Sequence, residues 1–500
     1  MGSMKKMKKF FLNIVILTMA SLILRGLDMF FTVYISGKIG AEGMGVFQLL
    51  LSVYFLFVTL ATAGIGITTT RMVAEELALG REVSAVRAVK KCLLYSVVCG
   101  TLAAILMILF APIIAKVWLQ GTISVYPLYA LSVSLPFIAV CSVLIGYFTA
   151  VRRVIKSASG QIFEQVLRIF ITVGLLTFFA PKGVDYATFA LAFASMLAEG
   201  GECLFLYLLY KQDKKQYKKG TEKKGLRKKM LSIALPVGGS TFVRTALNTY
   251  KQIMIPIGLK KSGLSVSKAL ADYGLIRGMA FPVLLFPSAL LAAISSLMVP
   301  EVAGEVVQQH SKKLESMIAR IFKLTLFFAI LVTGIFFTFA DDISLMIYKN
   351  TDVAPFLRLL SPLIAIMYLD GIVDALLKGL NEQVNVVKIN IIDTLASIAL
   401  LYTLLPMLGL KGYIIVLFVS ECLNGFLSVY HLMKVSEVPF RYFEWMILPG
   451  GLAALGILLA RLLLPGQFIA GVLFIILVYF GVLWLLGQIK KEDFHISGDS

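Results

Sequence analysis

Several basic side chains lie inside long apolar segments of this sequence. Four of them are flanked on both sides by mostly apolar residues: Arg25, Arg244, Lys251 and Arg277. A Lys or Arg at the centre of a membrane helix costs about 2.5–3.5 kcal/mol on insertion scales, so such a residue usually faces a partner or a water-filled cavity. Arg244 and Lys251 are seven residues apart, which places them on one helical face. Because arginine forks fit phosphate oxygens bidentately, this set predicts a binding site for a multiply charged anion.

The same apolar segments also contain acidic residues that could neutralise these bases. Glu164 precedes Arg168 by one helical turn, which favours a structural ion pair between them. Asp28 follows Arg25 by three residues, and we expect the two to pair part of the time. An alternative therefore stays open at this point, in which carbonyls and carboxylates satisfy all four bases and no anion binds.

Further carboxylates occur in the sixth, tenth, eleventh and twelfth apolar segments. A buried carboxylate titrates readily near neutral pH. Together with Asp28, several of these residues are therefore candidates for binding a coupling Na⁺ or H⁺. The candidates are Asp28, Glu199, Glu202, Asp374 and Glu421. The alternative for each is a structural hydrogen bond between helices.

Motifs for covalent chemistry are missing from the sequence. There is no P-loop, no HExxH and no nucleophile elbow, and the five cysteines and three histidines show no metal-ligand spacing. We therefore predict no catalytic residue, no metal site and no cofactor. Energy for a transport cycle would come from Na⁺ or H⁺ coupling or from the membrane potential.

The composition requires a membrane protein. The chain has 500 residues, of which 59% are hydrophobic and 15% charged, whereas soluble domains have roughly 45–50% apolar and about 25% charged residues. Strand-length alternation is absent, and apolar runs long enough to cross a bilayer as helices recur throughout. The sequence predicts an all-α polytopic protein with fourteen membrane helices, near residues 10–35, 44–70, 92–115, 122–150, 161–181, 184–210, 230–259, 273–300, 318–340, 353–378, 384–408, 410–433, 443–464 and 467–488.

The distribution of Lys and Arg supports this count. With a cytoplasmic N-terminus, 31 basic residues fall in inside segments and nine in outside segments, as the positive-inside rule requires. Both termini are then cytoplasmic, and the net charge of +19 reflects orientation rather than nucleic-acid binding. The basic segment 211–229 is interpreted as a solvated linker that could also contact anionic lipid headgroups.

An internal repeat divides the chain further. Arg25 and Arg244 each follow a serine by four residues, and the run Glu202-Cys203-Leu204 returns as Glu421-Cys422-Leu423. Six helices per repeat make the two copies parallel, with an axis along the membrane normal. The predicted organisation is a first lobe at 10–210, the linker at 211–229, a second lobe at 230–433 and two extra helices at 443–488. Two such lobes enclose a cavity that can open alternately to either side, which is the plan of a transporter.

The stretch from Ser21 to Glu75 resembles a known family. It contains Arg25, the run Ile39-Gly40-Ala41-Glu42-Gly43-Met44-Gly45 and the run Arg71-Met72-Val73-Ala74-Glu75. It is similar to the stage V sporulation protein B and polysaccharide-biosynthesis branch of the MOP superfamily, which includes MurJ-like lipid II flippases. The resemblance implies a cationic cavity for a pyrophosphate headgroup, with Arg25 as a cavity arginine, and a groove for a polyprenyl tail formed by the last two helices.

The leading hypothesis is a flippase, not an enzyme, in the bacterial plasma membrane. Its substrate would be an undecaprenyl-pyrophosphate-linked sugar, such as lipid II or a related precursor, and it would act as a monomer by alternating access. One rival is a multidrug antiporter of the same fold driven by Na⁺ or H⁺, which the sign of the four bases disfavours. A second rival is a membrane scaffold, which has no use for an internal repeat or buried charges.

Overall fold

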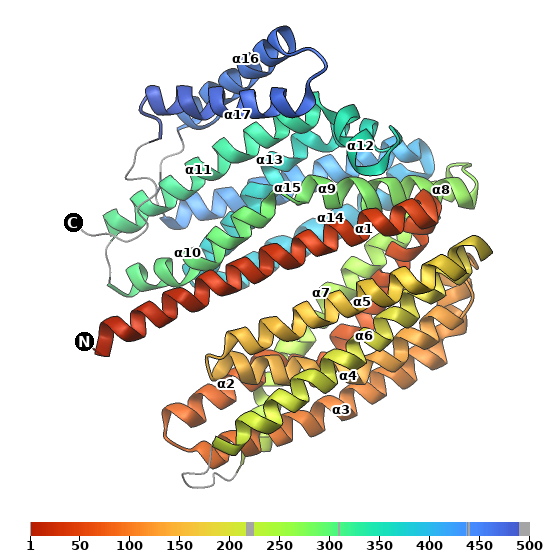
Figure 1. Ribbon diagram of the computed structural model, residues 1–500, viewed down its shortest axis with the longest axis vertical. Helices are drawn as coiled ribbons and strands as arrows, with labels where there is room; N and C mark the ends of the chain where they lie inside the picture. The colour runs from red at the N-terminus through yellow and green to blue at the C-terminus, as the bar shows by residue number, and fades with distance from the viewer. Residues whose placement is uncertain (1, 217–224, 309–310, 437, 439–440, 490–500) are drawn as a thin grey trace. The chain divides into compact units, whose positions relative to one another are not determined.

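The computed structural model describes residues 2–216, 225–308, 311–436, 438 and 441–489, and within these ranges the chain is helical with no strand (Figure 1). The helices of the first half are α1 (Gly2–Thr62), α2 (Ile65–Ala78), α3 (Glu82–Ile113), α4 (Tyr126–Ala150), α5 (Val154–Phe179), α6 (Val184–Asp213), α7 (Leu226–Lys261) and α8 (Val266–Tyr273). Those of the second half are α9 (Phe281–Leu285), α10 (Ser288–Gln308), α11 (Ser311–Thr338), α12 (Ala340–Tyr348), α13 (Ala354–Gly379), α14 (Gln383–Leu408), α15 (Leu410–Ser436), α16 (Leu448–Leu463) and α17 (Phe468–Leu485).

The helices confirm a multi-pass membrane protein. Twelve stretches within the described ranges are long and apolar enough to cross a bilayer, and the first of them, Met19–Ala78, is 60 residues long. It contains two of the predicted helices, because α1 changes direction at Gly40, whose φ of 69° favours glycine. The predicted eighth helix corresponds to the π-helical segment Gly274–Ala280, the short α9 and the first part of α10. The structure is therefore consistent with fourteen predicted helices.

Two of the predicted helices have different boundaries. The second was expected to continue to residue 70, but it ends at Thr62, and Ala63 and Gly64 adopt positive φ angles of 41° and 71° before α2 begins. The eighth was expected at 273–300, but a π-helical segment, Gly274–Ala280, and a turn before Ser288 divide it. Hydropathy does not reveal these breaks because apolar residues continue through both of them.

The helices form two compact units. The first comprises Met1–Gly278 with Leu401–Leu410, and the second comprises Met279–Leu400 with Lys411–Ser500. Helices α7 and α8 belong to the first unit because both pack against α1. The six-plus-six lobes expected from the repeat stay a prediction. Residues 217–224 of the basic linker and residues 490–500 at the C-terminus lie outside the described residues.

The core of the first unit forms around α4. Tyr147 and Phe148 are buried there with Met72 of α2, Cys92 of α3 and Tyr210 of α6. Small residues let the backbones approach closely. A Cβ on Gly146 would lie 2.5 Å from the carbonyl oxygen of Gly66. Such close approach is how membrane helices gain van der Waals contact without a hydrophobic driving force.

A row of polar and small residues joins the second half of α1 to α7. Thr249 donates a hydrogen bond to the Ser52 carbonyl at 3.0 Å, and the Ser52 hydroxyl donates to the Gln252 side chain. Further along, the Thr59 hydroxyl lies 3.3 Å from that of Thr245. These contacts satisfy polar groups that lipid could not.

In the second unit the C-terminal hairpin α16–α17 packs on α11. Ile475, Tyr479 and Leu483 of α17 are fully buried against Phe327 of α11, and the Tyr479 hydroxyl donates to the Phe327 carbonyl at 3.0 Å. The opposite face of the hairpin carries exposed aliphatic side chains, including Leu477 at 73% exposure. The hairpin is thus anchored on one side and presents apolar surface on the other.

We predict that Gly238→Ala destabilises the protein. An added Cβ would lie 2.7 Å from the carbonyl carbon of Ala63 and 2.8 Å from its oxygen, where only backbone could yield. Overpacking of this kind costs about 1–3 kcal/mol. Thermal melting of the detergent-purified variant should therefore show a lower Tm.

The neighbouring glycine supplies the control. A Cβ on Gly239 meets nothing within 4 Å, and Ala is a better helix former than Gly by about 1 kcal/mol. Gly239→Ala should leave the Tm unchanged or raise it. Equal melting of the two variants would show that the contact between Gly238 and Ala63 carries no stability.

Candidate functional site

The four predicted headgroup bases all lie in the first unit. Arg25 is on the first half of α1, Arg244 and Lys251 are on α7, and Arg277 is on the π-helical segment Gly274–Ala280. The side chains of Arg25 and Arg244 are exposed, and those of Lys251 and Arg277 are partly buried. An exposed arginine within an apolar span must face water or a charged group. The structure thus places the four bases on elements of one unit, and the anion site itself stays a prediction.

Close backbone packing positions Arg277. A Cβ on Gly274 would lie 2.0 Å from the carbonyl oxygen of Ala41, and one on Gly45 would lie 2.0 Å from that of Leu270. Only glycine permits α1 and the π-helical segment to approach so closely. A π-helical turn alters the direction of the side chains that it carries and is often found at functional sites. The register of Arg277 therefore depends on these two glycines.

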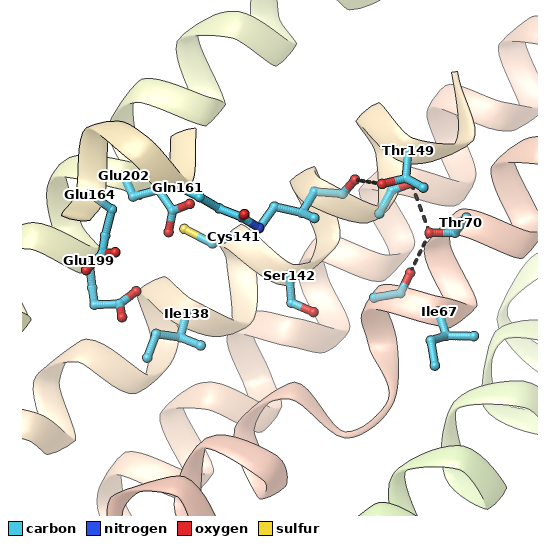
Figure 2. A pocket seen from close by; sticks show the side chains of 13 residues that line it. Ile67, Thr70, Ile138, Cys141, Ser142, Thr149, Gln161, Glu164, Glu199 and Glu202 are labelled. Carbon is cyan, nitrogen blue, oxygen red and sulfur yellow. Dashed lines mark hydrogen bonds between the residues drawn. The ribbon is translucent and has the colours of Figure 1, made fainter. Parts of the chain in front are cut away.

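The predicted acids Glu199 and Glu202 line a cavity of about 490 Å³ in the first unit (Figure 2). Glu164 of α5 lines the same cavity, although the sequence had suggested only an ion pair for it. Glu202 is 6% exposed and Glu164 9% exposed. The remaining lining comes from α2, α4 and α5 and includes Thr70, Cys141, Ser142, Thr149 and Gln161.

A network around Arg168 connects this cavity to α1. Nη1 of Arg168 lies 3.2 Å from Oε1 of Glu164, which confirms the expected ion pair, although the two groups are not aligned for a hydrogen bond. Nη2 of Arg168 lies 3.9 Å from Oδ1 of Asp28 and donates a hydrogen bond to the side chain of Gln165. Gln165 in turn donates to Oδ1 of Asp28 at 2.6 Å. Arg25 is close enough to act electrostatically on Asp28.

The second unit contains a separate acidic group. Asp374 lies on α13 and Glu421 on α15, and both act electrostatically on Asp370 of α13. The Asn424 amide donates to Asp370 at 2.9 Å, and the Ser420 hydroxyl donates to Asp393 of α14 at 2.7 Å. Much of this acidic group is thus held by hydrogen bonds between helices. No set of three His, Cys, Asp or Glu residues suited to a metal ion occurs among the described residues.

Sequence reasoning predicted the pair of Glu164 with Arg168 but missed the polar residues beside it. Gln161 and Gln165 share one helical face of α5 with this pair, at positions i, i+3, i+4 and i+7. Likewise Ser420 and Asn424 are one turn apart on α15. A search for polar side chains at helical spacing within apolar segments would have found both groups.

The fold and its apolar helices define a multi-pass membrane protein. Residues 10–300 match the family described as "Polysaccharide biosynthesis protein", and the chain belongs to this family. It is 27% identical over 444 residues to stage V sporulation protein B of Bacillus subtilis (strain 168), covering 86% of this chain and 85% of that protein. It is 24% identical over 462 residues to the lipid II flippase MurJ of the same organism, covering 83% and 81%.

Solved structures show the same fold. The lipid II flippase MurJ in an inward closed conformation has a TM-score of 0.72 at 13% identity, covering 95% of this chain and 100% of that one. An inward-facing multidrug resistance MATE transporter of the MOP superfamily has a TM-score of 0.63 at 14% identity, covering 85% and 100%. The predicted membership of the polysaccharide-biosynthesis family is therefore confirmed, and the solved structures share the predicted fold.

We predict that Arg168→Gln destabilises the first unit. The substitution leaves Glu164 buried without its counter-charge, and breaking a buried pair in this way costs about 3–5 kcal/mol. Adding Glu164→Gln to the same chain should restore part of the loss, because the unpaired charge is then removed. Thermal melting of the single and double variants measures both effects.

A surface pair provides the comparison. Arg71 and Glu75 form an ion pair at 3.0 Å whose side chains are 64% and 36% exposed, and pairs of this kind contribute about 0–1 kcal/mol. Arg71→Gln should therefore melt close to the unsubstituted protein. If Arg168→Gln behaves in the same way, the network around Arg168 has no structural role.

Proposed function

We propose that the protein is a flippase for an undecaprenyl-pyrophosphate-linked sugar, lipid II or a related cell-wall or polysaccharide precursor. It would move the headgroup from the cytoplasmic to the outer leaflet by alternating access, making and breaking no bond. The observation that carries the proposal is the set of four bases on α1, α7 and the π-helical segment of one unit. The names of two relatives, the lipid II flippase MurJ and stage V sporulation protein B, agree with it.

The chemistry of the bases suits a pyrophosphate. Arg25, Arg244 and Arg277 each present a planar fork that can bind two phosphate oxygens, whereas Lys251 supplies a compact point charge. The four bases together would more than neutralise a pyrophosphate diester. Removing the headgroup from water then costs less, and the sugar would follow the charged headgroup across the membrane. Rocking of the lobes would expose the site to each side in turn.

The polyprenyl tail would stay in lipid, next to the C-terminal hairpin. A cavity of about 530 Å³ lies between α12 and the start of α17 and is lined by Leu345, Met346, Phe468 and Ile469. The outer face of α16 and α17 adds exposed leucines, such as Leu462 and Leu473. An apolar strip of this kind could guide an isoprenoid chain while the headgroup crosses.

The remaining parts of the proposal concern orientation and energy. We place both termini in the cytoplasm of a bacterium, with the protein a monomer in the plasma membrane and the linker 211–229 against anionic lipid. Coupling to Na⁺ or H⁺ would use Asp28, Glu199 and Glu202 in the first unit and Asp374 and Glu421 in the second. The surplus of Lys and Arg on the inside segments supports the orientation.

A second candidate function is cation-coupled multidrug antiport. The acidic cavity formed by Glu164, Glu199 and Glu202 favours it, as does the fold shared with a multidrug resistance MATE transporter. An organic cation would bind acids of this kind and would be repelled by the four bases. The two functions therefore predict opposite effects when the bases are removed.

We predict that Arg25→Ala and Arg244→Ala each weaken binding of a lipid-linked sugar pyrophosphate. A hydrogen bond to a charged group contributes about 1.5–3 kcal/mol, so each loss should reduce affinity about tenfold or more. Native mass spectrometry of the detergent-purified protein measures this against ordinary anionic phospholipid. Lys182→Ala removes an exposed base that follows α5; it is the matched control and should bind normally.

Binding that shows no preference over anionic phospholipid, or that both arginine variants retain, would overturn the headgroup site. Tighter binding of organic cations by the arginine variants would favour the antiporter.

A further inference from the structure

The acidic cavity of the first unit follows α4 over a long distance. Its lining takes Ile138, Cys141, Ser142, Ile145, Gly146 and Thr149 from one face of this helix. From Ile138 to Thr149 the helix rises about 16 Å, at 1.5 Å per residue. The cavity therefore extends from the end of α4 to the middle of its span.

One end of the cavity lies next to a basic loop. Thr149 is followed directly by the end of α4 and by Arg152 and Arg153, and the positive-inside pattern assigns this loop to the cytoplasm. Hydroxyl and amide groups line the way inward, from Thr70, Thr149, Gln161 and Ser142 (Figure 2). The volume of about 490 Å³ can hold a chain of water molecules, each of which takes about 30 Å³.

At the other end of the cavity lie three glutamates, Glu164, Glu199 and Glu202. Nearby basic side chains do not balance their negative charge. The Cys141 thiol hydrogen-bonds to the Glu202 carboxyl, but Oε1 of Glu202 accepts no hydrogen bond in the part of the chain described. No ion pair within the described ranges joins Glu199 or Glu202 to a base, because Arg168 pairs with Glu164 and Asp28. A carboxylate buried without a counter-charge is costly, and the group takes up a proton instead.

A proton fits this site better than a metal ion. Two or three carboxylates could bind Na⁺ only if their oxygens converged on one point. Among the described residues no three His, Cys, Asp or Glu side chains are placed to hold a metal. Protonation needs no such convergence, because each carboxyl binds its proton alone.

We propose that Glu199 and Glu202 form a proton-binding site that exchanges protons with the cytoplasm through this cavity, and that its protonation regulates the headgroup base Arg25. The use of the site in transport rests on the proposed flippase function, whereas protonation itself does not. The titratable groups that face the site are Glu164 and Arg168 of α5, Cys141 of α4, Cys203 of α6, and Tyr54 and Asp28 of α1.

Arg168 couples the charge of the two glutamates to Arg25. When Glu199 and Glu202 are ionised, they attract the Arg168 guanidinium toward the cavity. The nearest base to the Asp28 carboxylate is then Arg25, three residues away, and the two attract each other. Protonation removes that attraction, so Arg168 neutralises Asp28 and releases Arg25 for a phosphate. Because Arg168 already lies 3.9 Å from Asp28, a change of side-chain rotamer is sufficient.

Labelling with dicyclohexylcarbodiimide tests the proton site without any transport assay. This apolar reagent forms an adduct with protonated carboxyls in membrane proteins, and peptide mapping by mass spectrometry locates it. We expect adducts on the peptide carrying Glu199 and Glu202, with a yield that falls about tenfold per pH unit once the carboxyls ionise. Asp352, an exposed acid, should stay unlabelled, and Glu199→Gln with Glu202→Gln should remove the adduct.

Two results would overturn the proton site. One is the absence of an adduct on this peptide at any pH between about 6 and 9. The other is protection by NaCl relative to choline chloride, which would assign the cavity to Na⁺. A positive label in a protein that flips no lipid would leave the proton site standing and count against the proposed function alone.

A second measurement tests the regulation. Binding of a lipid-linked sugar pyrophosphate, whose diester phosphates do not titrate near neutral pH, should be several-fold tighter at pH 6 than at pH 8. Asp28→Asn should abolish this dependence on pH and keep the carbodiimide adduct, because Arg25 then has no competing charge. A pH dependence that persists in Asp28→Asn would overturn the regulation.

Discussion

The cost of a charge in hydrocarbon is the constraint on which this structure depends. Each base or acid within a span must find a counter-charge, a hydrogen bond or water. In the first unit a single guanidinium, that of Arg168, lies close to both Glu164 and Asp28 and acts on Glu199. One arginine cannot neutralise so many carboxylates at once. Any change in the protonation of one acid therefore redistributes the remaining attraction.

The backbone of the first unit is shaped so that these groups stay in place. Gly40 redirects α1, Ala63 and Gly64 interrupt the second span, and Gly274 and Gly45 let the π-helical segment approach α1. At Gly64, Gly45 and Gly274, backbone atoms lie closer together than side chains would allow. The polar contacts of Ser52 with Thr249 and Gln252 then fix the register of α1 against α7. The bases on α1, α7 and the π-helical segment are thereby held within one unit.

Sequence reasoning found most of the fold because hydrophobicity and charge determine it. The membrane spans follow from apolar length, and the ion pair of Arg168 with Glu164 follows from helical spacing. Hydropathy does not report the break at Gly64 or the π-helical turn at Gly274, because each depends on close contact with the backbone of a different helix. Glu164 was assigned only to an ion pair, because the cavity that it shares with Glu202 exists only once α5 and α6 are packed.

The central claim is that the bases of the first unit conduct a pyrophosphate headgroup across the membrane. Transbilayer movement of a fluorescent lipid-linked sugar pyrophosphate in proteoliposomes, read by quenching from outside, tests it most directly. The account predicts that the Arg25→Ala, Arg244→Ala double variant loses this movement, whereas Lys182→Ala keeps it. Normal movement by a folded double variant would contradict the account.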